Sequence, residues 1–405
     1  MTELRNIPFS PPDITEEEIN EVANALRSGW ITTGPRTKEF EKRIAEYVGV
    51  NKAACLNSAT AAMELSLHIL GIGPGDEVIT SAYTYTASAS VIHHVGAKII
   101  LVDTAPNSFE MDYNQLENAI TDKTKAIIPV DIAGIMCNYD RIFEVVKNKK
   151  HLFVSNNNRQ KAIGRITVLA DAAHSFGAMR NGKKSGQVAD ITCFSFHAVK
   201  NLTTAEGGAV VWINTIGMTD DELYKEFMLY SLHGQSKDAF SKMQKGAWEY
   251  DIVYPAYKNN MTDILAAVGL IQLSRYDDLL KRRFEIVKLY ETLLDKENIE
   301  IIEHLGDDFK SSGHLLLCNL KGLSVEERNK VISKLAEKEI SSNVHYKPLP
   351  MFTAYKNLGF TIEDYPNAYK KYSNEITLPL HTFLDNEDVI YVSKAINEIL
   401  RNLRN

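Results

Sequence analysis

The chain has 405 residues, of which 44% are hydrophobic and 24% are charged, and these fractions exclude a disordered or collagen-like chain. The 52 acidic residues outnumber the 45 basic ones and leave a net charge of -7, which argues against a nucleic-acid-binding protein that relies on bulk positive charge. No apolar run reaches the roughly 20 residues of a membrane span, and the four cysteines form no CxxC pattern, so we expect a cytoplasmic globular protein with reduced thiols and neither a metal site nor a disulfide framework.

Residues 1–30 are expected to form an N-terminal arm and a helix. The length of the whole chain favours two or three domains. The first residues, MTELRNIPFSPPD, lack the apolar core of a signal peptide. Thr15 and Glu18 have the spacing of a capping box, which starts a helix. The apolar positions of that helix recur at helical spacing, at Ile19, Val22 and Leu26.

Residues 31–260 are expected to form a large α/β domain, because short apolar strands alternate with helices there. The strands are rich in β-branched residues and apolar on both faces, which is typical of a covered, largely parallel sheet. We therefore predict a doubly wound sheet of seven strands. The strand candidates are residues 53–57, 76–80, 98–103, 125–130, 166–171, 191–196 and 208–213.

The polar stretch 150–165 interrupts this alternation and is interpreted as a surface insertion, because the strand pattern resumes directly after it. Residues 261–405 are expected to form a bridging helix and a smaller α+β domain. The stretch 262–296 is the longest helical pattern in the chain, and the strand candidate HLLLCNL precedes a further capping box at Ser324 and Glu327.

Two features at strand ends suit a cofactor that carries a phosphate and a planar ring. After the strand ending at Leu56, the small residues Ser58, Ala59 and Thr60 open a helix, and the free N–H groups of such a corner suit a phosphate. Taken alone, this corner is more often a helix cap without a ligand. Tyr85 follows the next strand and borders the ligand crevice of an α/β sheet, although such a tyrosine is often only packing.

Two further segments supply a carboxylate and an amine. Asp171 closes an apolar strand, and a carboxylate there needs a cation unless it only caps a helix. The segment FSFHAVKNLTTAEGG delivers Ser195, His197 and Lys200, and a lysine held in a cleft can become an amine nucleophile, although most lysines are solvated. Asn260 precedes a helix and is placed to reach a phosphate, or simply forms a turn.

Together these groups match the needs of pyridoxal phosphate (PLP). This cofactor requires a lysine for a Schiff base and an acid that keeps its pyridine nitrogen protonated. A phosphate corner, a covering aromatic ring, a carboxylate and an amine follow one another on a single α/β sheet, and a chance assembly of that set is improbable. The sequence therefore predicts a PLP enzyme.

The chain resembles a known family, the nucleotide-sugar aminotransferases of the DegT type, within the fold-type I (aspartate aminotransferase-like) PLP enzymes. The resemblance runs over nearly the whole chain, from SGWITTGPRTKEFE through GIGPGDEVIT and AIIPVDIAG to VHYKPLPMF and LPLHTFLDNEDV. Its most specific segments are LADAAHSFGA and SFHAVKN...EGG. Asp131 and Pro350 stand where relatives often carry histidine.

The resemblance implies a role for each matching residue. Lys200 forms the Schiff base and moves protons, and Asp171 pairs with the pyridine nitrogen. His174 lies near the phenolic oxygen of the cofactor, and Tyr85 stacks on its ring. The remaining residues are expected to hold the phosphate (Ala59, Thr60, Ser195 and, from the neighbouring subunit, Asn260) or to contact the substrate (Thr33, His197, His345 and the stretch 231–257).

The activity that the resemblance implies is transfer of the amino group of L-glutamate, released as 2-oxoglutarate, to a UDP- or dTDP-linked 4-keto-6-deoxy sugar. The product would serve cell-surface polysaccharide or lipopolysaccharide synthesis, and the enzyme would be a homodimer with its active sites at the interface. Open alternatives are a 3-keto-sugar or cyclitol aminotransferase, a PLP sugar dehydratase, and a sugar-nucleotide sensor without turnover. Family members that are dehydratases carry histidine in place of the lysine, so Lys200 favours transamination.

Overall fold

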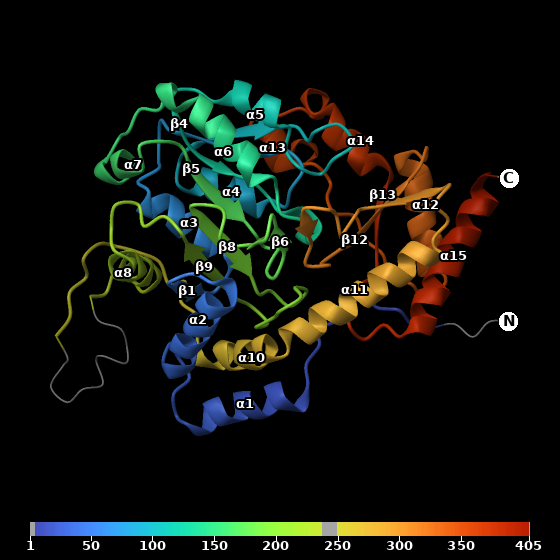
Figure 1. The fold of residues 1–405 in the computed structure, drawn as a ribbon, viewed down its shortest axis with the longest axis horizontal. Helices are drawn as coiled ribbons and strands as arrows, with labels where there is room; N and C mark the ends of the chain where they lie inside the picture. The colour runs from blue at the N-terminus through green and yellow to red at the C-terminus, as the bar shows by residue number, and fades with distance from the viewer. Residues whose placement is uncertain (1–4, 237–248, 405) are drawn as a thin grey trace.

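A seven-stranded sheet forms the centre of the larger part of the molecule (Figure 1) in a computed structural model that describes residues 5–236 and 249–404. All seven predicted strands form, with ends that differ from the predicted ones by one or two residues. They are β1 (Ala53–Leu56), β2 (Glu77–Ser81), β3 (Lys98–Val102), β4 (Thr124–Ile128), β5 (Thr167–Asp171), β8 (Ile191–Ser195) and β9 (Gly208–Trp212).

The strand order is β1-β9-β8-β5-β4-β2-β3. All pairings from β8 to β3 are parallel, whereas β9 runs antiparallel to both of its neighbours. The carboxyl ends of six strands and the amino end of β9 therefore lie at one edge of the sheet. That edge is where an α/β sheet places its ligands.

Helices cover both faces of the sheet, which confirms the doubly wound prediction. On β1, Ala54 and Leu56 face one apolar core, and Ala53 and Cys55 face another, as the alternation of a strand requires. The first face packs against α3 (Ala59–Ile69), α4 (Ala87–His94) and α8 (Asp220–Ser231). The second packs against α2 (Pro35–Val48), α5 (Tyr113–Ala119), α6 (Tyr139–Asn148) and α10 (Asp263–Ser274).

The predicted helical stretch 262–296 is divided in the structure. It forms α10 and α11 (Tyr276–Leu293), which follow one another along the lower side of the view in Figure 1. The break is at Arg275, whose backbone leaves the helical region. The guanidinium of Arg275 bonds Asp13 and Glu18 of the N-terminal region at 2.9 and 2.8 Å, and these contacts hold the arm at the break.

The predicted N-terminal helix is α1 (Glu16–Arg27), and its capping box forms as expected. Its apolar stripe, however, does not face the core: Ile19 and Leu26 are 51% and 54% exposed, whereas Glu18 and Ala25 are buried. Glu18 turns inward because its carboxylate accepts hydrogen bonds from Arg275 and Gln272 of the adjacent helix. These polar contacts override the hydrophobic pattern.

A three-stranded antiparallel sheet forms the core of the C-terminal region, in the order β10-β12-β13. The predicted strand HLLLCNL is its central strand. The strands are β10 (Ile299–Ile301), β12 (Leu316–Leu320) and β13 (Glu375–Leu378). They share an apolar cluster with α11, α12 (Val325–Ala336) and α15 (Asn386–Arg404). The capping box of Ser324 and Glu327 begins α12 as predicted.

Smaller elements complete the chain. A short sheet, β11-β6-β7, joins residues of the two regions. Its strands and the remaining helices are β6 (Met179–Arg180), β7 (Lys183–Lys184), β11 (Phe309–Lys310), α7 (Asn158–Ile163), α13 (Thr353–Asn357) and α14 (Pro366–Asn374). The N-terminal arm also reaches the C-terminal region, where Ile7 pairs with Ile340.

The stretch 150–165 packs at the far end of α3 from the phosphate corner. The amide nitrogens of Asn157 and Gln160 donate to the carbonyl of Leu70 at 3.1 and 3.2 Å, and Arg159 donates to the carbonyl of Ile69 at 2.6 Å. These groups satisfy carbonyls that the end of a helix leaves without partners. The stretch therefore stabilises α3 from the end opposite Ser58.

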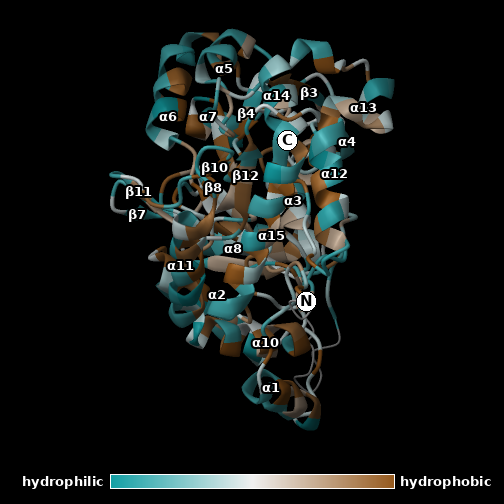
Figure 2. Ribbon diagram, turned by 90° about the vertical axis from the view of Figure 1, so that its right-hand side faces the viewer, coloured by the Kyte–Doolittle hydropathy of each residue, from teal (hydrophilic) through white to brown (hydrophobic). Residues whose placement is uncertain are grey.

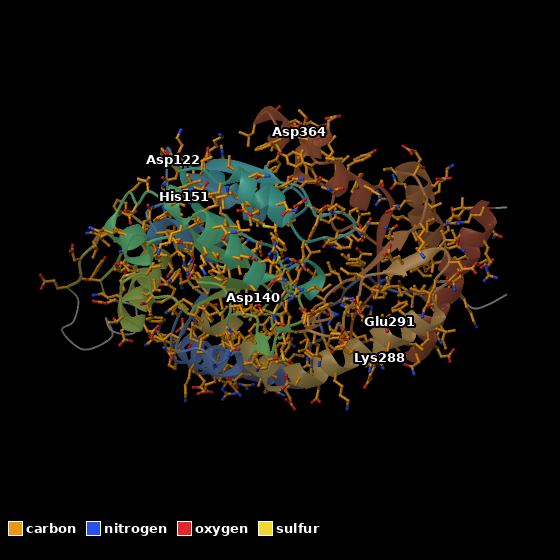
Figure 3. The ribbon with its side chains drawn as sticks, turned by 45° about the horizontal axis from the view of Figure 1, so that its top comes forward. Asp122, Asp140, His151, Lys288, Glu291 and Asp364 are labelled. Atoms are coloured by element: carbon orange, nitrogen blue, oxygen red, sulfur yellow. The ribbon has the colours of Figure 1, made fainter. Side chains whose placement is uncertain are left out.

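The surface helices are amphipathic, with teal and brown sides in Figure 2. Charged side chains such as Asp140 on α6 and Lys288 on α11 lie on the outside of the molecule (Figure 3). Within the described ranges, no helix has both the length and the apolarity that a membrane span requires. The domain boundaries at residues 1–30, 31–260 and 261–405 stay a prediction.

Candidate active site

The predicted site residues converge because their strands end at the same edge of the sheet. Asp171 is the last residue of β5, and Ser195 is the last residue of β8. Thr60 and Tyr85 follow the carboxyl ends of β1 and β2. The order β1-β9-β8-β5-β4-β2 places these ends along the same edge, with β4 between β5 and β2.

A cavity of about 430 Å³ lies at this edge. Two of the eleven predicted site residues, Thr33 and Asn260, are not among those that line it. The other nine are Ala59, Thr60, Tyr85, Asp171, His174, Ser195, His197, Lys200 and His345. This volume matches that of a small-molecule site, which typically has at least about 300 Å³.

The phosphate corner is built by a cap and a close backbone contact. Ser58 caps α3 by accepting the N–H of Ala61 at 3.0 Å, so the earlier N–H groups, at Ala59 and Thr60, remain for a ligand. Gly208 of β9 lies directly behind: a Cβ there would be 2.4 Å from the carbonyl carbon of Ser58 and 2.5 Å from the nitrogen of Ala59. Only glycine allows this approach.

A Gly208→Ala substitution is therefore expected to displace the corner. Overpacking of this kind costs about 1–3 kcal/mol of stability, and the displaced N–H groups should weaken phosphate binding. Thermal denaturation without cofactor and a PLP titration measure the two effects. Gly73→Ala is the matched control, because its Cβ would meet only a carbonyl oxygen at 3.6 Å. Unchanged PLP affinity in Gly208→Ala would contradict this description of the corner.

Asp171 is a buried carboxylate with too few partners of its own. It is 4% exposed, and it accepts hydrogen bonds from the hydroxyl of Ser88 at 2.6 Å and the N–H of Ala173 at 3.2 Å. Burial raises the pKa of Asp171, and these two bonds and the nearby Lys200 oppose that rise. A cationic ligand would stabilise the ionised form, since a buried charge needs a partner of opposite sign.

Lys200 lines the same cavity as this carboxylate. Desolvation lowers the pKa of its amine to about 8, although the charge of Asp171 opposes the change. A substantial fraction of Lys200 is therefore neutral near physiological pH, and the neutral amine is the nucleophilic form. Its neighbour Asn201 bonds the carbonyl of Ser312 and the ring of His314, at 2.8 and 2.9 Å, which holds the loop after β8.

His174 is buried, with one nitrogen bound and one free. Its Nε2 atom lies 3.0 Å from the hydroxyl of Tyr346, but Nδ1 is buried without a hydrogen-bond partner among the described residues. Burial, followed by the charges of Lys200 and His345, lowers the pKa of His174 well below its ordinary value. A neutral imidazole with a free nitrogen is suited to a polar group of a ligand, because an unsatisfied buried nitrogen is costly.

The mouth of the cavity is partly apolar and open. Tyr85 is 60% exposed, and its ring lies 6.0 Å from that of Tyr346. His197 is also exposed there, with its Nε2 atom 3.6 Å from the carboxylate of Glu206. An exposed tyrosine at the rim can cover a planar ligand, and the predicted stacking of Tyr85 on the cofactor ring stays a prediction.

Thr33 and Asn260 bond each other instead of facing the cavity. The amide nitrogen of Asn260 donates to the hydroxyl of Thr33 at 2.6 Å, and that hydroxyl donates to the carbonyl of Met261 at 2.5 Å. The substrate contact expected of Thr33 stays a prediction. The role of Asn260 in a neighbouring subunit stays a prediction, and part of the predicted substrate stretch 231–257 lies outside the described residues.

Sequence reasoning missed three residues of the site. Ser88 orients Asp171, and Tyr346 contacts His174. Asp131 is 1% exposed and lines the cavity, where it accepts bonds from Ser175 and Tyr139 at 2.6 and 3.0 Å, and burial raises its pKa to about 7. The sequence offered a signal for two of them: Ser88 lies one turn after Tyr85, and Tyr346 directly follows His345.

The groups around the cavity fit PLP. The corner of Ala59 and Thr60 suits its phosphate, Asp171 suits a protonated pyridine nitrogen, and the neutral amine of Lys200 suits its aldehyde. His174 lines the cavity as well, and its buried Nδ1 has no hydrogen-bond partner among the described residues.

Comparisons with known proteins agree with PLP as the cofactor. The model of the DegT/DnrJ/EryC1/StrS aminotransferase family matches residues 12–397. Spr1654 of Streptococcus pneumoniae, assigned as a sugar aminotransferase, is 56% identical in its PMP-form structure, which covers 98% of this chain and 100% of its own with a TM-score of 0.96. Its PLP-form structure gives a TM-score of 0.95.

Two of the sequence relatives have names that state a function. The spore coat polysaccharide biosynthesis protein SpsC of Bacillus subtilis is 37% identical over 407 residues, which cover 99% of each chain. A UDP-4-amino-4-deoxy-L-arabinose–oxoglutarate aminotransferase of Shewanella sediminis is 34% identical over 405 residues, which cover 98% of each chain.

Proposed function

The chain belongs to the DegT/DnrJ/EryC1/StrS aminotransferase family and is a PLP-dependent sugar aminotransferase of fold-type I, and we propose that it moves the amino group of L-glutamate to a nucleotide-linked 4-keto sugar. The observation that carries this proposal is the cavity in which Lys200 faces Asp171 beside a phosphate corner. The product is proposed to enter cell-surface polysaccharide synthesis.

The names of two relatives support the choice of substrates. The Shewanella relative is named for a UDP-linked sugar, an amino group at C-4, and oxoglutarate, the product of glutamate. The Bacillus relative is named for polysaccharide synthesis. A UDP- or dTDP-linked 4-keto-6-deoxy sugar is the acceptor that we propose, and amination at C-4 is favoured over C-3 for the same reason.

The residues of the cavity divide the work. PLP, when bound, supplies an aldehyde that captures amines and a protonated ring that accepts electrons. Asp171 holds the positive charge of the ring nitrogen, and Ser88 holds Asp171 in place through its 2.6 Å bond. Ala59, Thr60 and Ser195 bind the phosphate, so that the reacting carbon stays near the amine of Lys200.

Lys200 is the proton carrier of both half-reactions. Its amine accepts a proton from the carbon of glutamate in the first half and returns one to the carbon of the sugar in the second. A pKa of about 8 suits both directions, because a group with a pKa close to the working pH both accepts and releases protons readily. His174 stays neutral and offers its free nitrogen as a fixed hydrogen-bond partner.

We further propose a cytoplasmic homodimer with active sites at the interface. Tyr85 and Val199 are 60% and 40% exposed at the cavity mouth, and a second subunit would cover both. Asn260 does not face its own cavity, which leaves it available to the cavity of a partner. The four cysteines are free thiols, as expected in a reducing compartment.

The alternatives differ from the proposal in identifiable ways. A dehydratase of this family carries histidine in place of Lys200, and this chain does not. A sensor without turnover has no need of a desolvated lysine beside a buried carboxylate. A 3-keto-sugar or cyclitol acceptor remains the nearest rival, because it would use the same groups.

An acceptor screen with ¹⁵N-glutamate separates these functions. UDP- and dTDP-linked 4-keto-6-deoxy sugars, a 3-keto isomer and a keto-cyclitol are each incubated with the PLP-loaded enzyme. The proposal predicts ¹⁵N at C-4 of the sugar, read by NMR. Label at C-3, label only in the cyclitol, or release of ammonia without labelled sugar would each contradict it.

The rate of PLP capture by the cofactor-free protein should follow the lowered pKa of Lys200. Because only the neutral amine reacts, the rate is expected to rise with pH and level off above about 8, well below the range of an ordinary lysine. Stopped-flow absorbance of the covalent lysine–cofactor link measures this rate. A rate that continues to rise up to pH 10 would show an unperturbed amine.

A further inference from the structure

A chain of hydrogen bonds links the cavity to a buried carboxyl group on the small sheet. His345 lines the cavity, and its Nδ1 atom lies 2.9 Å from the hydroxyl of Thr377. That hydroxyl lies 2.6 Å from Oε1 of Glu375, and Oε2 of Glu375 accepts the backbone N–H of His345 at 2.9 Å. Glu375 and Thr377 lie on β13 and are 1% and 0% exposed, so no solvent competes with these bonds.

We propose that Glu375 and Thr377 are positioning residues that decide which ring nitrogen of His345 carries the proton, and so whether His345 offers the substrate a donor or an acceptor. The inference rests on the proposed function, because it takes His345 as a substrate contact. It gives two residues of β13, Glu375 and Thr377, a role in substrate binding at the cavity.

The proton count along the chain supports two states. A threonine hydroxyl has one proton to donate. When Glu375 is ionised, that proton points to its carboxylate, so Nδ1 of His345 must be the donor to Thr377 and Nε2 is left as an acceptor. When Glu375 is protonated, it donates to Thr377, Thr377 donates to Nδ1, and Nε2 carries the proton.

The change from the ionised to the protonated state of Glu375 adds one proton to the hydrogen-bonded chain and moves two others along it. His345 gains a proton at Nε2, passes one from Nδ1 to Thr377, and Thr377 passes one to Glu375. His345 and Thr377 end neutral, and Glu375 ends as the carboxylic acid. Among the described residues none bonds Nε2, so this atom is free to meet a ligand in the cavity.

The surroundings place the switch within an accessible pH range. Burial raises the pKa of Glu375 to about 8, against its bonds to Thr377 and His345, and burial lowers the pKa of His345 to about 4, so the imidazole stays neutral while Glu375 titrates. Other ionisable groups face the pair from each neighbouring element. They are Arg328 on α12, Tyr83 after β2, Cys318 on β12, Tyr346 beside His345, His174 after β5, His314 before β12, and Lys200 at the cavity.

The test is the ring-nitrogen ¹⁵N shifts of His345 in the ¹⁵N-histidine-labelled, PLP-loaded protein between pH 6 and 9.5, because the two neutral tautomers have different shifts. The signal is assigned by its loss in His345→Gln. We expect the proton to be on Nε2 below about pH 8 and on Nδ1 above it. In Glu375→Gln and Thr377→Val one tautomer should persist throughout, and Thr377→Ser should restore the change.

Glu41→Gln is the matched control. Glu41 is also a buried carboxyl group with a raised pKa, and it accepts a backbone N–H from Cys55 and a hydroxyl bond from Tyr224, each at 2.9 Å. It is not among the residues that line the cavity, so the tautomer change of His345 should be unaffected. A second readout is the KM of the keto sugar, expected to change roughly three- to tenfold in Thr377→Val with a smaller effect on kcat.

The tautomer is read without substrate, so the two proposals fail separately. A tautomer that does not change in the wild type, or that changes equally in Thr377→Val, would overturn the relay even if the keto sugar is aminated. If the tautomer changes as expected and no keto sugar is aminated, the relay holds and the proposed function is wrong. Should Glu375→Gln fail to fold, Thr377→Val and Thr377→Ser decide the result.

Discussion

A Lys200→Ala variant is expected to lose transamination by roughly 10⁴-fold or more while it keeps its fold. General acid–base catalysis alone contributes about 10²- to 10⁴-fold, and covalent capture of the cofactor is lost as well. The fold should persist because Lys200 is only partly buried and bonds no carboxylate directly, although the pKa of Asp171 should rise further without its positive charge. Circular dichroism and gel filtration check the fold, and the acceptor assay checks the rate.

Lys125→Ala is the control for removal of a desolvated lysine. Lys125 is 3% exposed, its pKa is lowered by burial, and it bonds the carbonyl of Asp122 at 2.8 Å, near the amino end of β4 and away from the cavity. This variant is expected to lose stability but to retain turnover. Glutamate-to-keto-sugar transfer by Lys200→Ala within a hundredfold of the wild type would remove Lys200 from its assigned role.

An Asp171→Asn variant is expected to lower the rate by about 10²- to 10⁴-fold. Asparagine keeps the shape, and its single oxygen can accept the N–H of Ala173 while its amide nitrogen donates to the hydroxyl oxygen of Ser88, but it carries no charge to hold a protonated ring nitrogen. Removing one partner of a buried ion pair costs about 3–5 kcal/mol, and each 1.36 kcal/mol in the barrier is a factor of ten. The loss should appear in both half-reactions, measured by single-turnover absorbance.

Asp103→Asn tests whether any buried carboxylate gives the same effect. Asp103 is 0% exposed and accepts backbone N–H bonds from Thr104, Asn367 and Ala368, each at 2.8 Å, but it is not among the cavity residues. We expect this variant to melt at a lower temperature with an unchanged single-turnover rate. A rate for Asp171→Asn within threefold of the wild type would contradict the assigned charge pair.

Local sequence pattern was sufficient for the sheet. The seven strands are short, apolar on both faces and separated by helices, and such strands have few other ways to be buried. Because parallel strands place their carboxyl ends at one edge, residues such as Asp171 and Ser195 could be assigned to one cavity before any contact was known. PLP was inferred from the carboxylate, the amine, the aromatic ring and the phosphate corner, and the family resemblance then implied a role for each residue.

Contacts between distant segments were not predictable in the same way. The bond from Ser88 to Asp171 spans 83 positions and that from Tyr346 to His174 spans 172, and neither residue type implies a particular partner. The exposure of the apolar stripe of α1 has a related cause, since Glu18 is drawn inward by Arg275, some 257 positions away. Burial of one polar group through a long-range partner reverses what helical periodicity favours.

The break of the long helix at Arg275 has the same origin. Propensity favours helix on both sides of that residue, and only the contacts of its guanidinium with Asp13 and Glu18 distinguish it. Thr33 bonds Asn260 and Met261, two further contacts between distant segments that the sequence does not indicate.

The measurement that tests the account most directly is the absorption spectrum of the PLP-loaded protein before and after L-glutamate. We predict a band of the lysine-linked cofactor that disappears with glutamate and returns with 2-oxoglutarate, because Lys200, Asp171 and the phosphate corner together support the first half-reaction. A lysine-linked band that ignores glutamate would contradict glutamate as the donor. No such band at all would contradict Lys200 as the residue that binds the cofactor.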